Sequence, residues 1–144
     1  MLRTLSLVGL LLMILAMAGL LLTHSLLSPS PVIITIQCAA FGLMLWARAT
    51  FGKRSLHASA EPTDGGLVTT GPYRFIRHPI YTAACLFGWA GILGNWSLTA
   101  ATLGTLLFAG AIVRMLCEER LVTEMYPAYR DYARVTKRMF PYAF

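Results

Sequence analysis

Charged side chains are scarce in this chain, and their scarcity argues against most soluble architectures. Asp, Glu, Lys and Arg together make up 12% of the 144 residues, whereas hydrophobic residues make up 57%. A soluble globular domain carries roughly 25% charged residues. The apolar residues also come in long runs rather than in alternation, which is the pattern of a protein that spans a membrane.

Acidic residues are the rarer of the two charged kinds. Six Asp and Glu stand against twelve Lys and Arg, which gives a formal net charge of +6. A basic excess can indicate a nucleic-acid partner. Here the basic residues gather beside the apolar runs, as they do in the cytoplasmic flanks of membrane proteins. We therefore expect the membrane as a partner and no nucleic acid.

The sequence also lacks the patterns of disulfide, zinc and Rossmann proteins. Its three cysteines form no C-x-x-C pair, so no disulfide framework is predicted. His24, His57 and His78 are far apart and lack the short spacing of zinc ligands, so we expect no metal site. No G-x-G-x-x-G motif follows a strand pattern, which argues against a soluble dinucleotide-binding fold.

Four apolar runs predict four membrane-spanning helices. Their ranges are Leu5–Leu27, Pro31–Ala47, Pro79–Leu93 and Ser97–Leu116. The first run is too long for the apolar core of a signal peptide, and no small-residue cleavage site follows it, so we expect a retained helix.

The tail from Cys117 to Phe144 is polar and basic, and its apolar residues fall near one helical stripe interrupted at Pro127. Such a stripe is typical of an amphipathic helix that lies on a membrane or covers a site. The chain is thus predicted to be all-α: an integral membrane bundle of about four transmembrane helices with a cytoplasmic C-terminal amphipathic helical tail. Residues 1–144 would form a single domain.

Positive charge falls on one side of the predicted bundle. The long connection at residues 48–78 and the tail carry basic residues, whereas the short connections at 28–30 and 94–95 carry no charge. By the positive-inside rule, both termini, the long connection and any site that they form face the cytoplasm.

The segment that leads into the third span reads Gly-Pro-Tyr-Arg-Phe-Ile-Arg-His-Pro-Ile-Tyr, from residue 71 to residue 81. Pro79 suits the first turn of a helix, which places Arg77 and His78 at the helix N-terminus. Free backbone N–H groups and the helix dipole favour an anion there, and a guanidinium adds a planar cation. This arrangement predicts an anion clamp. The alternative is an Arg that reaches lipid phosphate and a His that caps the helix.

Glu118 and Glu119 follow at the expected end of the fourth span, where acidic residues oppose the helix dipole. Such a local cost often marks a functional site. A tight turn at residues 94–95 would make the third and fourth spans antiparallel neighbours, which brings the Glu pair close to the anion clamp. The four residues then either line a ligand site or form salt bridges that staple the hairpin. Arg114, four residues before Glu118, is placed to pair with it.

Three features together resemble the isoprenylcysteine carboxyl methyltransferase family of integral membrane enzymes, to which the phospholipid N-methyltransferases are related. They are the motif Arg77-His78-Pro79-Ile80-Tyr81, the pair Glu118-Glu119, and a tail spaced as Tyr129-x-x-Tyr132-x-x-Val135-x-x-Arg138-x-x-Pro141. The matching region covers about residues 65–141.

The resemblance implies a methyltransferase that uses S-adenosylmethionine, with its cofactor held by about residues 65–144. It implies a lipophilic or lipidated substrate from the bilayer, foremost the carboxylate of an isoprenylcysteine-like molecule, with a phospholipid amine as the alternative. It also implies site residues. Arg77, His78 and Glu118 are expected at the catalytic centre, and the cofactor pocket is expected to be lined by His78, Tyr81, Glu118, Glu119, Tyr129 and Tyr132.

Two other classes of protein compete with the enzyme. In a non-enzymatic membrane interaction subunit the same polar residues would only staple the helices, so cofactor binding separates the two interpretations. A transporter would place polar residues near mid-membrane, whereas the predicted spans are apolar at their centres. We expect an enzyme in the inner (cytoplasmic) membrane of a prokaryote.

Overall fold

The computed structural model describes residues 1–52 and 66–141. These residues form five α-helices and one 3₁₀ helix, with a single isolated bridge in place of any strand: α1 (Leu2–Leu22), α2 (Pro31–Phe51), η2 (Gly71–Arg74), α3 (Pro79–Gly94), α4 (Leu98–Met125) and α5 (Tyr129–Val135). The predicted all-α bundle is therefore confirmed. The polar middle of the long connection, with Lys53 and Arg54, lies outside the described residues.

Helix boundaries follow from local sequence. Pro31 and Pro79 each occupy the first turn of their helix, where a missing backbone N–H costs nothing. Ser97 caps α4 because its hydroxyl accepts a hydrogen bond from the Ala100 backbone N–H at 3.0 Å. α1 ends before the predicted Leu27, and His24 just beyond it adopts a left-handed conformation, with φ of 54°.

Three of the helices, α1, α2 and α4, are long enough and apolar enough to cross a membrane. α3 is also apolar but has 16 residues. At 1.5 Å per residue it extends about 24 Å, somewhat less than a bilayer core of about 30 Å. The membrane bundle expected from composition is thus present, with its third apolar helix the shortest.

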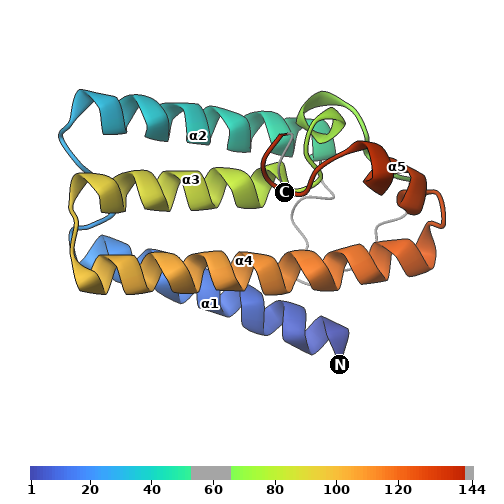
Figure 1. Ribbon diagram of the computed structural model, residues 1–144, viewed down its shortest axis with the longest axis horizontal. Coiled ribbons are helices and arrows are strands. Elements are labelled where there is room, and N and C mark those ends of the chain that lie inside the picture. Colours follow the sequence, from blue (N-terminus) through green and yellow to red (C-terminus); the bar gives the residue numbers. More distant parts are fainter. Residues whose placement is uncertain (53–65, 142–144) are drawn as a thin grey trace.

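Figure 1 shows how the helices are arranged. α3 lies between α2 and α4, and α1 packs along α4. The α1–α2 and α3–α4 connections meet at one end of the bundle, whereas η2, α5 and the start of α3 gather at the other (Figure 1). Segments far apart in the sequence therefore meet at the end that carries the polar motifs.

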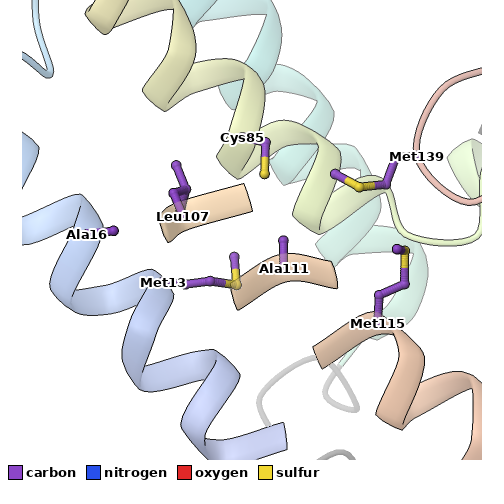
Figure 2. Close-up of a cluster of buried hydrophobic side chains, with 7 residues drawn as sticks. All are labelled: Met13, Ala16, Cys85, Leu107, Ala111, Met115 and Met139. Carbon is purple, nitrogen blue, oxygen red and sulfur yellow. The ribbon is translucent and has the colours of Figure 1, made fainter. Parts of the chain in front are cut away.

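A cluster of buried side chains joins the helices beneath that end (Figure 2). Its members come from α1, α3, α4 and the residues that follow α5, and they are Met13, Ala16, Cys85, Leu107, Ala111, Met115 and Met139. Met139 is fully buried although it lies beyond α5. Its side chain anchors the residues that follow α5 to the bundle.

α1 and α4 touch backbone to backbone. A Cβ atom on Gly9 would lie 2.9 Å from the Gly110 carbonyl oxygen, and one on Gly110 would lie 2.7 Å from the Gly9 carbonyl oxygen. Small residues permit such an approach between membrane helices. The same Cβ on Gly9 would lie 3.2 Å from the backbone nitrogen of Arg114. α1 therefore supports α4 directly at Arg114, the first charged residue of that helix.

One expectation about α4 was wrong. The helix continues to Met125, so Glu118 and Glu119 lie inside it rather than at its C-terminus. The segment from Cys117 to Met125 contains no helix breaker, and Pro127 is the first residue that ends the pattern. The predicted conflict with the helix dipole therefore does not arise at this pair, because the dipole acts on the last turn.

Candidate active site

The start of α3 and the last third of α4 meet at one end of the bundle. Arg77 Nε lies 3.0 Å from Glu119 Oε1, and His78 Nε2 lies 3.2 Å from the same oxygen. The proximity of these groups was predicted from the α3–α4 hairpin and is confirmed. The side chains of Arg77 and His78 are each 8% exposed and that of Glu119 is 13% exposed, so these contacts are largely shielded from solvent.

The C-terminal segment completes this end of the bundle. We use that name for residues 136–139. Ile76 and Lys137 form a parallel bridge, and the backbone N–H groups of Arg77 and His78 donate to the carbonyls of Lys137 and Arg138 at 2.8 and 2.9 Å. The segment therefore runs beside the chain that enters α3, a contact that the periodicity of the sequence does not predict.

Glu119 is engaged on both of its carboxylate oxygens. Oε1 faces Arg77 and His78, and Oε2 accepts a hydrogen bond from Arg138 Nε at 3.0 Å. Two guanidinium groups and one imidazole thus surround a single carboxylate. Glu119 joins the start of α3, α4 and the C-terminal segment.

Arg77 also connects the start of α3 to the end of α5. Its Nη1 donates to the Ala133 carbonyl at 3.1 Å and to the Thr136 carbonyl. These carbonyls lie at the end of α5, where a helix favours a positive charge. Both Nε and Nη1 of Arg77 therefore contact protein acceptors. Its predicted roles in the anion clamp and at the catalytic centre remain predictions.

Glu118 has a different set of neighbours. Its Oε1 accepts a hydrogen bond from the Tyr81 hydroxyl at 2.5 Å and lies 3.2 Å from Arg114 Nε. Its Oε2 lies 3.8 Å from His78 Nδ1 and makes no hydrogen bond to a residue that the structure describes. The Glu118 side chain is 23% exposed. One oxygen of this carboxylate therefore keeps its capacity to accept hydrogen bonds.

His78 stands between the two carboxylates. Its Nε2 faces Glu119 and its Nδ1 faces Glu118, at 3.2 and 3.8 Å. The imidazole stacks on the Tyr81 ring, with centroids 5.7 Å apart and an interplanar angle of 24°. The carboxylates and the stacked ring hold the imidazole in one orientation.

The two predicted tyrosines of the tail lie on α5. Tyr129 is buried, and burial together with the charge of Glu119 raises the pKa of its phenol. Burial raises the pKa of Tyr132 to about 12, and its hydroxyl donates to the Tyr73 carbonyl at 2.5 Å. Both phenols are therefore neutral near pH 7. Tyr129 is near the Glu119 charge, whereas the Tyr132 hydroxyl is engaged by η2.

The structure adds two residues to the predicted set. Arg138 contacts Glu119, and Arg114 contacts Glu118 and donates to the Tyr81 hydroxyl at 2.6 Å. The i, i+4 spacing already pointed to a pair between Arg114 and Glu118. No short sequence spacing predicts the contact of Arg138 with Glu119, because these residues are far apart in the sequence and meet only in the folded chain. Within the described ranges, no group of three or more His, Cys, Asp or Glu side chains is placed to hold a metal ion.

An apolar helical bundle with a charged cluster at one end defines an integral membrane protein with a candidate ligand site at its edge. The family model described as phospholipid methyltransferase matches residues 32–129. The chain belongs to this family of membrane methyltransferases. The match covers α2, α3 and α4 and includes both the motif at residues 77–81 and the Glu pair.

Two curated proteins are similar to the chain. The cobalt-zinc-cadmium resistance protein CzcN of Cupriavidus metallidurans is 32% identical over 119 residues, which cover 78% of this chain and 50% of that protein. The nickel-cobalt-cadmium resistance protein NccN of Alcaligenes xylosoxydans xylosoxydans is 42% identical over 109 residues, which cover 69% of this chain and 48% of that protein. The chain thus spans about half the length of these relatives. No solved structure matches it significantly.

Proposed function

We propose that the chain is an S-adenosylmethionine-dependent methyltransferase that transfers a methyl group to the carboxylate of an isoprenylcysteine-like lipid. Membership in a membrane methyltransferase family supports the reaction type. The observation that carries the assignment of the site is the meeting of His78, Glu118 and Glu119 at one end of an apolar bundle. Buried charges in such a setting are costly unless they pair or serve a function.

The residues of this cluster fit the cofactor. The Glu118 side chain is partly exposed, and its Oε2 accepts no hydrogen bond from a described residue, so this oxygen suits an ammonium or a ribose hydroxyl. The neutral phenol of Tyr129, near Glu119, suits a hydrogen bond to the cofactor. Cationic side chains beside His78 suit a carboxylate, either the cofactor's own or that of the acceptor.

Bound S-adenosylmethionine supplies an electrophilic methyl carbon attached to a sulfonium. A carboxylate acceptor is already nucleophilic, so the protein has to supply proximity and orientation rather than a strong base. In this proposal Glu119 fixes His78 and Arg77 in place, and His78 and Arg77 orient the acceptor. The buried surroundings exclude bulk water from the reacting groups.

Both partners need a route to this edge of the bundle. The basic residues of the tail and of the 48–78 connection support an orientation with both termini and the site in the cytoplasm, at the inner membrane of a prokaryote. The cofactor would then enter from water. The lipophilic acceptor would enter from the bilayer, along the exposed apolar surfaces of the helices.

A phospholipid amine is the second candidate acceptor, and the match to the phospholipid methyltransferase family favours it. An amine has to lose a proton before or during methyl transfer. His78 Nδ1, at 3.8 Å from Glu118 Oε2, is the group that would accept it. The two acceptors thus predict different kinds of product, an ester in one case and an N-methyl amine in the other.

The test uses the full chain in nanodiscs with S-adenosylmethionine labelled in its methyl group. One reaction contains N-acetyl-S-farnesylcysteine and a second contains phosphatidylethanolamine. A methyl ester releases labelled methanol in base, whereas an N-methyl group does not. Base-labile label in the first reaction is expected. Base-stable label in phosphatidylethanolamine would show that the phospholipid amine, and not the isoprenylcysteine-like carboxylate, is the acceptor. A folded protein that binds no cofactor would favour the interaction-subunit interpretation.

A further inference from the structure

Three polar side chains form a triangle at the junction of α3 and α4, and two of them, Arg114 and Tyr81, have no role in the reaction proposed above. Its corners are Arg114, Tyr81 and Glu118. Arg114 Nε donates to the Tyr81 hydroxyl at 2.6 Å, and this hydroxyl donates to Glu118 Oε1 at 2.5 Å. Arg114 Nε also lies 3.2 Å from that same carboxylate oxygen, which closes the triangle.

The direction of each hydrogen bond in the triangle is fixed by chemistry. A guanidinium group can only donate, so the Tyr81 oxygen accepts from Arg114. The single hydroxyl proton of Tyr81 is then committed to Glu118. Tyr81 was predicted to line the cofactor pocket, but its proton is already engaged by the neighbouring carboxylate. We therefore expect the Tyr81 hydroxyl proton to act through Glu118, while the place of Tyr81 in the lining of the cofactor pocket stays a prediction.

Burial makes this arrangement rigid. The Arg114 side chain is 6% exposed, and a buried cation needs a bonded counter-ion. Linked hydrogen bonds strengthen one another where the local dielectric is low. The backbone of Arg114 is supported by the close approach of α1 at Gly9. The triangle thus holds Oε1 of Glu118 at a fixed place.

Fixing one carboxylate oxygen also fixes the other. Oε2 of Glu118 is turned to His78 Nδ1 at 3.8 Å and has no hydrogen bond to a described residue, whereas both oxygens of Glu119 are engaged. Resting on the function proposed above, we propose that Arg114 and Tyr81 are positioning residues that aim Oε2 of Glu118 at the α-ammonium group of the bound cofactor. A charged donor is the best match for a carboxylate oxygen held in this way.

The test compares two ligands that differ in that amine. S-adenosylhomocysteine carries it, and 5′-S-(3-carboxypropyl)-5′-thioadenosine lacks it but keeps the adenosine, the sulfur and the carboxylate. Affinities are measured by calorimetry on detergent-purified full chain. The variants are Tyr81→Phe, which keeps the ring stacked on His78, and Arg114→Lys, which keeps the charge. Arg134→Gln is the control, since Arg134 is 80% exposed and pairs with Asp131 on the surface. Thermal unfolding shows that each variant is folded.

The expected result is a loss that depends on the amine. Tyr81→Phe should lower the affinity for S-adenosylhomocysteine by about tenfold, which is the scale of one charge-assisted hydrogen bond. The affinity for the ligand that lacks the amine should not change. Arg114→Lys should also lower the affinity for S-adenosylhomocysteine alone. Arg134→Gln should change the affinity for neither ligand. Equal weakening of both ligands, or of neither, would overturn the positioning role while leaving the cofactor site intact. A folded wild-type protein that binds neither ligand would instead overturn the proposed function itself.

Discussion

Glu119 accepts contacts on both carboxylate oxygens, from Arg77 and His78 on one and from Arg138 on the other. Its neighbour Glu118 uses one oxygen, which Tyr81 holds, and leaves the second without a hydrogen bond to a described residue. Glu119 also has the less exposed side chain, 13% against 23%. Two adjacent residues of the same type thus have different surroundings.

The difference follows from helix geometry. Adjacent residues of an α-helix are turned by about 100° from one another, since there are 3.6 residues per turn. Glu119 therefore faces Arg77 and the C-terminal segment, whereas Glu118 faces Tyr81 and Arg114. The pair reads as one motif in the sequence, but its surroundings suggest an anchor in Glu119 and a ligand contact in Glu118.

The largest expected effect on folding comes from Glu119→Gln, which removes the charge at the centre of the anchor. Two buried or partly buried guanidinium groups would lose their counter-ion, and the loss of one partner from a buried pair costs about 3 kcal/mol. Thermal and urea unfolding in detergent measure this free energy. Glu124→Gln, an exposed position on α4, is the matched control and should change it by less than about 0.5 kcal/mol. A Glu118→Gln variant that is destabilised more than Glu119→Gln would reverse the comparison.

A somewhat smaller loss is expected for Met139→Ala, which tests how the C-terminal segment is held. Met139 is fully buried in the cluster of Figure 2, so its truncation should cost about 2 kcal/mol in the free energy of unfolding. Because Arg138 is its neighbour, the variant should also weaken the contact with Glu119. Val135→Ala, at a position 82% exposed, serves as the control. Unchanged stability in Met139→Ala would mean that the segment is not anchored there.

The smallest expected effect is that of Tyr132→Phe, which removes the hydrogen bond to η2. The loss should be about 1 kcal/mol at pH 7. The pKa of Tyr132 is raised from 10.0 to about 12, so the folded state favours the neutral phenol. Its contribution is fully present below pH 10 and is lost as the pH rises to about 12. Between pH 8 and pH 12, the free energy of unfolding should therefore fall less steeply with pH for Tyr132→Phe than for the wild type. The same dependence on pH in both proteins would contradict this assignment.

Much of this arrangement could be predicted from the sequence. Long apolar runs indicated the membrane helices, and the uncharged turn at residues 94–95 indicated the hairpin that brings Glu119 to Arg77. Both signals are local, because hydropathy and turn residues act over a few positions. The predicted end of α4 was wrong because the fall in hydropathy after Leu116 was taken for the end of the helix. The helix continues to Met125, two residues before Pro127.

Other parts could not be predicted in this way. The bridge between Ile76 and Lys137 joins two irregular segments, and no periodicity marks their register. Met139 is a single apolar residue in a basic tail, so its burial depends on the cluster that the fold provides. The different surroundings of the two glutamates depend on the same segment, because Arg138 comes from it.

The most direct test of the central claim is a thermal shift of the detergent-purified chain with S-adenosylhomocysteine, run beside Glu118→Gln and the control Arg134→Gln. A ligand that binds only the folded state at about 100 times its dissociation constant adds roughly 2.7 kcal/mol of stability. We predict a clear rise in melting temperature for the wild type and the control, and a rise that is lost in Glu118→Gln. A folded wild type without a shift, or a full shift in Glu118→Gln, would contradict the account.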